Sequence, residues 1–320
     1  TLGGEHVKRL WHPMSDNTVT EATRVTSYWH KRLRHAPLVF LRRLSQRGVL
    51  PACIATVLKM PLCAACMLAE AHRRSWRTKG ETPKGVRRKT DTKPGEGTSC
   101  DHIISGQPGL MPQTLGNLTH ERFWGSTLYV DHFSDYIYNH LIKGTTSQET
   151  LDSKIAYERI AKTYGVNIKA YHADNLRFND KNFTSHCNRA GQKLSFCGVG
   201  AHHQNAIAES KIKEITYNAR TILLHAKRLW PAVIKTALWP FALQAAVEKH
   251  NKLNLDANGK SPLEKFSGIA DDIRPSDFHT FGCPVFILDA ANQSGGIGTP
   301  KWEPRSHAGI YLGSSPCHAG

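Results

Sequence analysis

Residues 171–209 constrain the fold of this chain more than any other stretch. They begin with YHADN, at the end of the apolar run of residues 166–171, and they end in the helix-like HHQNAIAE. Two acids, Asp174 and Glu209, stand 35 positions apart (209 − 174), one at an expected strand end and one in the first turns of an expected helix. A strand end and a helix packed on one sheet can direct both carboxylates into the same space, so we predict an α/β fold with an acidic site.

The segments around this stretch alternate between strand-like and helix-like patterns. Apolar and β-branched runs predict strands at residues 99–104, 127–130, 136–142, 166–173 and 193–198, with a Gly- and Pro-rich loop at 106–116. Apolar residues at helical spacing predict helices at 148–164, 181–190, 203–229 and 231–252. This order gives a mixed five-stranded sheet with helices packed on it.

A His/Cys constellation precedes this region. His30 and His35 are separated by four residues, and Cys63 and Cys66 by two. Neutral imidazoles and thiolates are the ligand set of closed tetrahedral zinc sites, and a small helical unit gains much of its folding free energy from such an ion. We therefore predict a zinc-binding (Zn²⁺) helical module, against the alternative of two surface histidines and two core cysteines.

The charge balance indicates a polyanionic partner. The chain has 42 Lys+Arg and 26 Asp+Glu, a formal net charge of +16, and residues 1–98 hold +12 of it (19 − 7). Nucleic acid is the commonest such partner; the alternative is a basic solubilising surface. Residues 78–98 read as a basic linker, either simply solvated or tracking DNA. No apolar run approaches the roughly 18 residues of a membrane span, so no membrane partner is expected.

A third acid is expected to join Asp174 and Glu209. Asp101 and Asp131 compete for this place, because both lie in or beside an apolar run, and Asp101 is favoured by its position near the start of the first strand. Three uncompensated carboxylates repel one another unless cations fill the space between them. Hard oxygen ligands suit Mg²⁺ or Mn²⁺, so we predict a divalent-metal site. Asp135 reads as a turn or surface acid.

Four further residues are predicted to contact nucleic acid. Asn205 lies at the start of the expected long helix, where a helix N-terminus favours anions, and Lys211 and Lys213 follow within the next turns. Arg177 stands three residues after Asp174 and is either a structural or a phosphate partner. The alternative for each helix residue is a solvated side chain.

Five motifs resemble the integrase segment of copia-type LTR retrotransposons, over about residues 28–316. WHKRLRH with CAAC resembles the zinc-binding module, and LYVDHFSDY resembles the second strand of the catalytic core. ADNLRF and HHQNAIAES resemble the strand and the helix that carry the second and third catalytic acids. Residues 278–316 resemble the segment that follows the core.

The resemblance implies an RNase H-like catalytic core with the triad Asp101, Asp174 and Glu209, and metal-dependent joining of element DNA 3′ ends to target DNA. It also implies a homo-oligomer that reaches the nucleus through cytoplasmic particles. The boundaries we expect are an unassigned segment (1–24), the zinc module (25–77), the basic linker (78–98), the catalytic core (99–268) and a truncated β-rich segment (269–320).

Two other functions stay open at this point. One is an RNase H-like nuclease that hydrolyses DNA without joining it. The other is an inactive DNA-binding relic of a retroelement that keeps the zinc module and the basic arm. The start at Thr1 and the Gly-ended SSPCHAG lead us to expect that the chain is part of a longer protein.

Overall fold

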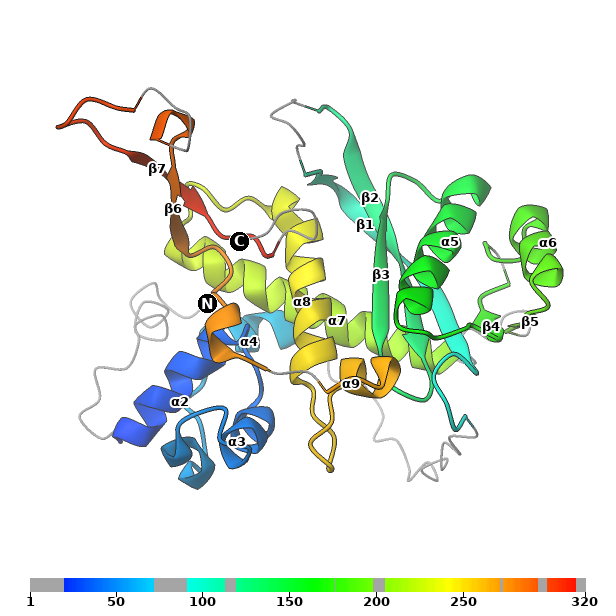
Figure 1. Cartoon of the computed structure of the whole chain (residues 1–320), viewed down its shortest axis with the longest axis horizontal. Helices are drawn as coiled ribbons and strands as arrows, with labels where there is room; N and C mark the ends of the chain where they lie inside the picture. The colour runs from blue at the N-terminus through cyan, green and yellow to red at the C-terminus, as the bar shows by residue number, and fades with distance from the viewer. Residues whose placement is uncertain are drawn as a thin grey trace, which may run out of the picture.

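The computed structural model describes residues 20–71, 91–112, 119–175, 177–197, 205–270, 273–292 and 298–314. A helical module comes first and comprises α2 (Glu21–Arg32), α3 (Leu38–Gln46), the 3-10 helix η1 (Ala52–Thr56) and α4 (Ala64–Glu70) (Figure 1). Thr20 caps α2 by accepting a hydrogen bond from the Thr23 backbone N–H. Gly48, at φ +74°, follows the end of α3, where the left-handed conformation favours glycine. Among the described residues, the first helix of the module therefore begins at Glu21.

The predicted mixed five-stranded sheet is confirmed. Its strands are β1 (Thr98–Leu110), β2 (Arg122–Asp131), β3 (Ile137–Ile142), β4 (Ala170–Ala173) and β5 (Lys193–Phe196). They lie in the order β3-β2-β1-β4-β5, with β1, β2 and β3 antiparallel and with β4 and β5 parallel to β1. Three antiparallel strands extended by two parallel ones form the RNase H-like arrangement.

The limits of two strands differ from the prediction. β1 continues to Leu110, into the first part of the expected loop, because β2 pairs with it beyond a register shift between Ile104 and Gly109. Gly125 permits this close pairing, since a Cβ atom there would lie 2.4 Å from the Ile103 carbonyl oxygen. β4 is shorter than expected, because its neighbours β1 and β5 pair with residues 170–173 alone.

Helices cover the two faces of the sheet and enclose two cores. α5 (Ser147–Thr163) and α6 (Lys181–Arg189) lie on one face, over an aromatic core that includes Tyr129, Tyr157, Tyr171, Phe178 and Phe183. α7 (Ala206–Leu229) and α8 (Trp239–Leu253) cover the other face, over an aliphatic core that includes Leu128, Val130, Ile215, Ile222 and Leu243. α8 begins later than predicted, after the 3-10 helix η3 (Thr236–Leu238), and residues 203–204 of the expected long helix lie outside the described residues.

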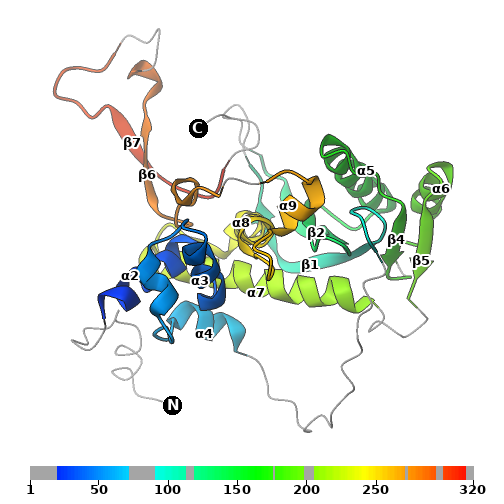
Figure 2. The same cartoon turned by 60° about the horizontal axis from the view of Figure 1, so that its bottom comes forward.

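The N-terminal module packs against the C-terminal half of α7 and the C-terminal end of α8 (Figure 2). A third core joins its helices to the chain after α8; it contains Leu33, Leu41, Leu44, Leu253, Leu255 and Phe278. Arg34, whose side chain is 1% exposed, donates to Glu248 Oε2 at 2.7 Å and to the Ala245 carbonyl oxygen at 2.8 Å. Some of the basic charge of the module is therefore internal and attaches it to α8.

The expected linker 78–98 ends inside the core. Residues 78–90 lie outside the described residues, but Gly95 donates its backbone N–H to Asp131 and Asp91 contacts His132 at 3.1 Å. After α8 come α9 (Pro262–Ser267) and the 3-10 helix η4 (Pro275–Asp277). The two-stranded ribbon of β6 (Pro284–Leu288) and β7 (Ser306–Ile310) then stands apart from the main sheet, as the expected β-rich segment (Figure 1).

Within the described ranges, no helix combines the length and the apolar character that crossing a membrane requires.

Candidate functional site

The N-terminal module gathers the four predicted zinc ligands. His30 lies in the last turn of α2 and His35 in the turn that follows, while Cys63 precedes α4 and Cys66 lies within it. One ligand atom from each residue lies within 4.8 Å of the other three. The histidines are 6% and 5% exposed, so the cluster is largely shielded from solvent.

The spacing of these atoms fits a tetrahedral ion. His30 Nε2 and His35 Nδ1 are 3.0 Å apart, and Cys63 Sγ lies 3.4 Å from His35 Nδ1. Cys66 Sγ lies 3.5 Å from both of these nitrogens. Zinc bonds of about 2.0–2.1 Å to nitrogen and about 2.3 Å to sulfur place tetrahedral ligand atoms about 3.3–3.8 Å apart. The three sulfur–nitrogen distances lie in this range and the nitrogen–nitrogen distance is shorter, so the donor set and its approximate spacing suit Zn²⁺.

The surroundings prepare the imidazoles for a metal. His30 Nδ1 lies 2.9 Å from the Ala36 carbonyl oxygen, so this nitrogen carries the proton and Nε2 presents its lone pair. Arg34 and His35 have φ angles of 56° and 61°, an uncommon left-handed pair that turns the His35 ring back toward His30. Burial lowers the pKa of His35 to about 4, so its imidazole is neutral at pH 7.

The surroundings of the cysteines favour the form that binds a metal as well. Contact with Cys66, together with hydrogen bonds to His30 and His35, lowers the pKa of Cys63 far below its ordinary value despite burial. A thiolate is the form that binds zinc. The His35 ring also packs edge-to-face on His225 of α7, with ring centroids 4.6 Å apart, which links the cluster to the long helix.

Asp101 and Asp174 occupy neighbouring positions on parallel strands. β1 and β4 pair in register as Ser99 with His172 and Cys100 with Ala173, so the next position in this register joins Asp101 to Asp174. The side chain of Cys100 belongs to the core under α5 and α6. Because side chains alternate along a strand, Asp101 faces the side of the sheet that α7 covers. Each of the two carboxylates accepts a hydrogen bond from the backbone N–H that follows it.

Glu209 is exposed in the first turn of α7. The start of this helix lies beside β1, because the Asn205 side chain donates to the Cys100 carbonyl oxygen. Burial and then the negative charges of Asp174, Asp101 and Glu209 raise the pKa of the Cys197 thiol. One buried side chain is thus within electrostatic reach of all three predicted acids. In the part of the chain that the structure describes, however, their oxygens do not form a closed ligand set like that of the His/Cys cluster.

Asp131, the alternative first acid, has a structural environment. It is fully buried and accepts hydrogen bonds from the Gly95 N–H at 2.7 Å, the Ser134 N–H at 2.8 Å and the Ser134 hydroxyl at 2.6 Å. These bonds hold the turn between β2 and β3. Asp135 lies in the same turn at φ 67° and pairs with Lys211, in agreement with its reading as a turn acid.

The four residues predicted to contact nucleic acid have different environments. Lys213 is exposed on α7, with its ammonium 5.8 Å from the centre of the Tyr217 ring. Arg177 is exposed, but its guanidinium also donates to Thr145. Asn205 is 2% exposed, and Lys211 is held by two carboxylates. The last two therefore differ from the expected solvent-facing DNA contacts, because Asn205 is buried and the Lys211 ammonium is paired with carboxylates of the protein.

Sequence reasoning missed the polar side chains next to the acids. His172 lies 2.9 Å from Ser195 Oγ through Nδ1 and 3.6 Å from Cys197 Sγ through Nε2. Cys197 is 3% exposed. His172 precedes Asp174 by two residues, so strand alternation already places it on the same face and would have identified it.

Comparisons with known proteins give matches among solved structures. No protein-family model and no curated protein matches the chain. The HTLV-2 integrase catalytic core domain in complex with magnesium (trimeric form) has 16% identity and a TM-score of 0.39, over 55% of this chain and 98% of that one. The catalytic core domain of BIV integrase has 14% identity and a TM-score of 0.37, over 54% and 93%. The simian T-cell lymphotropic virus intasome in complex with PP2A regulatory subunit B56 gamma has 14% identity and a TM-score of 0.41, over 91% and 87%.

Proposed function

We propose that this chain is an integrase, a metal-dependent polynucleotidyl transferase that joins the 3′ ends of element DNA to target DNA. One observation carries the proposal: Asp101, Asp174 and Glu209 come from β1, the end of β4 and α7, and their charges all act on Cys197. At this place of an RNase H-like sheet, carboxylates can hold the divalent ions that phosphate transfer requires.

The three acids have distinct roles in this proposal. Asp101 directly follows the last residue of β1 that pairs with β4, Asp174 directly follows β4, and the two would hold one Mg²⁺ or Mn²⁺ ion. Glu209 approaches from the helix and would help to hold a second ion. Ions held by these residues would supply charge stabilisation for a phosphodiester exchange. The attacking group would be the 3′-OH of element DNA, or water when an end is trimmed.

The charge distribution supports DNA as the substrate. Residues 20–71 hold 8 Lys+Arg and 2 Asp+Glu, and the whole chain has a formal net charge of +16. Lys213 and Arg177 lie exposed close to the acids along the chain and would contact phosphate groups. The His/Cys cluster would bind Zn²⁺ and hold the basic module on α7. A copia-type element as the source, a homo-oligomeric assembly and action in the nucleus are parts of the same proposal.

A strand-transfer assay tests the proposed function. A labelled duplex with a pre-cut 3′ end is incubated with the zinc-loaded chain, target DNA and Mg²⁺ or Mn²⁺. We expect products longer than the labelled strand, and we expect Glu209→Gln to abolish them while DNA affinity stays within about twofold. Glu303→Gln, which changes an exposed acid of the C-terminal segment, is the matched control.

Each alternative has its own result in this assay. Shortened strands without longer products would identify a nuclease that hydrolyses DNA. DNA binding without any metal-dependent product would identify a binding relic. Joining that persists in Glu209→Gln would show that Glu209 is not one of the catalytic acids.

A further inference from the structure

The start of α7 is attached to the sheet by a buried amide. Asn205 lies at the N-cap position of the helix and donates its side-chain N–H to the Cys100 carbonyl oxygen at 3.1 Å. Cys100 directly precedes Asp101 on β1. This hydrogen bond therefore fixes the position of the helix start along the strand that carries the first acid.

One and a half turns later, an ion-pair network attaches α7 to the turn between β2 and β3. Lys211 Nζ lies 2.6 Å from Asp135 Oδ2 and 3.1 Å from Glu214 Oε2, and its side chain is only 15% exposed. The Lys211 ammonium is therefore held between a carboxylate of the turn and a carboxylate of its own helix.

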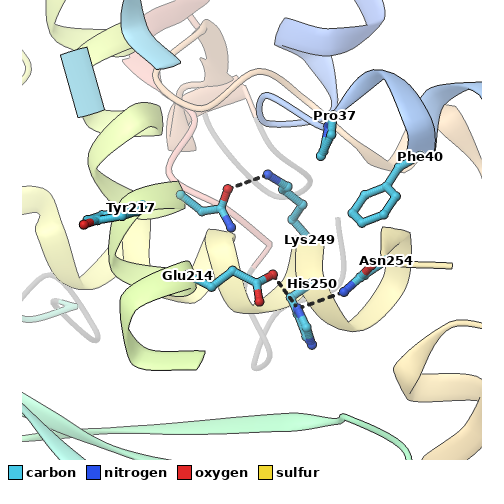
Figure 3. Close-up of a pocket in the computed structure, with 8 residues that line it drawn as sticks. Pro37, Phe40, Glu214, Tyr217, Lys249, His250 and Asn254 are labelled. Carbon is cyan, nitrogen blue, oxygen red and sulfur yellow. Dashed lines mark hydrogen bonds and ion pairs between the residues drawn. The ribbon is translucent and has the colours of Figure 1, made fainter. Parts of the chain in front are cut away.

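α8 completes this network. His250, with a side chain that is 1% exposed, lies 2.9 Å from the Asp135 carbonyl oxygen through Nε2 and 3.3 Å from Glu214 Oε1 through Nδ1. Figure 3 shows Glu214 and His250 facing each other at a pocket of about 230 Å³ between the N-terminal module and the two helices. Hydrogen bonds and ion pairs of polar side chains thus connect the turn, α7 and α8.

These attachments determine where Glu209 points. Successive residues of an α-helix are rotated by about 100°, so Lys211 lies about 200° around the axis from Glu209. With Lys211 held against the turn, Glu209 is directed to the other side of the helix, where it is exposed. Asn205 fixes the helix along its axis, and Lys211 fixes its rotation.

We propose that Asn205 and Lys211 are positioning residues that set the placement of Glu209 relative to Asp101 and Asp174. Neither residue acts through contact with DNA in this arrangement. The inference rests on the proposed function only for the role of Glu209 as a metal ligand. Groups that orient metal ligands typically change metal affinity or activity by about 10–100-fold when they are replaced.

The test compares Lys211→Met, Lys211→Arg and Asp135→Asn with Lys213→Met as the matched control on the same helix. Asn tolerates the positive φ of residue 135, so Asp135→Asn removes the charge with little backbone strain. The readouts are the Mn²⁺ affinity of the zinc-loaded chain by electron paramagnetic resonance, the Mg²⁺ concentration for half-maximal joining, the salt dependence of DNA affinity, and Tm.

If Lys211 is a positioning residue, Lys211→Met should bind Mn²⁺ about tenfold more weakly and need a higher Mg²⁺ concentration for half-maximal joining. Asp135→Asn should change both quantities in the same direction. Lys211→Arg, which keeps the positive charge, should recover much of the Mn²⁺ affinity. Lys213→Met should instead reduce the salt slope of DNA binding by about one without changing metal affinity. A lower salt slope for Lys211→Met with unchanged Mn²⁺ affinity would identify a DNA contact and overturn the proposal. So would a lower Tm with unchanged Mn²⁺ affinity, which marks a purely structural role.

Failure of the proposed function would be recognised separately. A wild-type chain that joins no DNA would refute the integrase activity, whereas the Mn²⁺ affinities of the wild type, Lys211→Met and Glu209→Gln would still measure the positioning effect. Equal Mn²⁺ affinity in all three would overturn the inference even if the wild type joins DNA.

Discussion

Replacement of Asp131 by Ala tests which acid belongs to the proposed catalytic site. Asp131 is fully buried and accepts hydrogen bonds from the backbone N–H groups of Gly95 and Ser134 and from the Ser134 hydroxyl. Gly95 and Ser134 are buried as well. Ala would therefore leave two backbone donors without their acceptor inside the protein.

The expected loss of stability follows from these donors. A buried backbone N–H that loses its partner costs about 1–3 kcal/mol, so Asp131→Ala should lower the free energy of unfolding by about 2–6 kcal/mol. For a chain of this size, the middle of that range corresponds to a decrease in Tm of roughly 6 °C. Asn keeps one acceptor oxygen, so we expect Asp131→Asn to lose about half as much stability as Asp131→Ala.

Thermal and urea unfolding of the zinc-loaded chain, followed by circular dichroism, measures this difference. Asp152→Asn, which changes an exposed acid of α5, is the control, and Asp101→Asn should stop joining with little change in Tm. A normal Tm for Asp131→Ala combined with complete loss of joining would refute the reasoning. Asp131, and not Asp101, would then be the first catalytic acid.

Two other outcomes follow from the structure. Cys66→Ser removes one of the four zinc ligands, so the zinc content measured by atomic absorption should fall from about one ion per chain toward zero. The helical circular dichroism signal of the N-terminal module should decrease as well. A full zinc content in this variant would contradict the site. Although burial opposes ionisation, His250 and Lys211 lower the pKa of Glu214 from 4.5 to about 2, so its stabilising contribution is complete above about pH 4.5 and is lost as the pH falls toward 2. Urea unfolding between pH 2 and 6 should therefore show a shallower acid decline for Glu214→Gln, and identical curves would rule out this contribution.

Local patterns were sufficient to predict most of the elements. The helices expected at residues 148–164 and 181–190 appear as α5 (Ser147–Thr163) and α6 (Lys181–Arg189), because their apolar spacing and the N-cap residues Thr146 and Asp180 are local signals. The extent of β4 was not predictable in this way. An apolar run describes what can be buried, whereas the ends of a strand depend on how far its neighbours pair with it.

The candidate sites show the same difference between local signals and long-range pairing. The His/Cys cluster was readable because its residue types and spacings carry the chemistry, and the structure brings all four together. The environment of Lys211 could not be predicted from the sequence, because its partner Asp135 is 76 residues away. Asp135 lies in a turn and has a positive φ. From the sequence, a lysine on a helix start next to an acid looks like a DNA contact. Long-range pairing makes it an internal cation.

The core between the N-terminal module and the end of α8 has a consequence for how this chain folds during synthesis. Leu41 and Leu44 of α3 pack with Leu253 and Phe278, more than 200 residues later in the chain (253 − 44 = 209). The zinc ligands lie within residues 30–66 and can meet as soon as that segment has left the ribosome. The leucines, in contrast, keep an uncovered apolar face until residues 253–278 have been made. The packing of α3 is therefore completed long after its zinc ligands can meet.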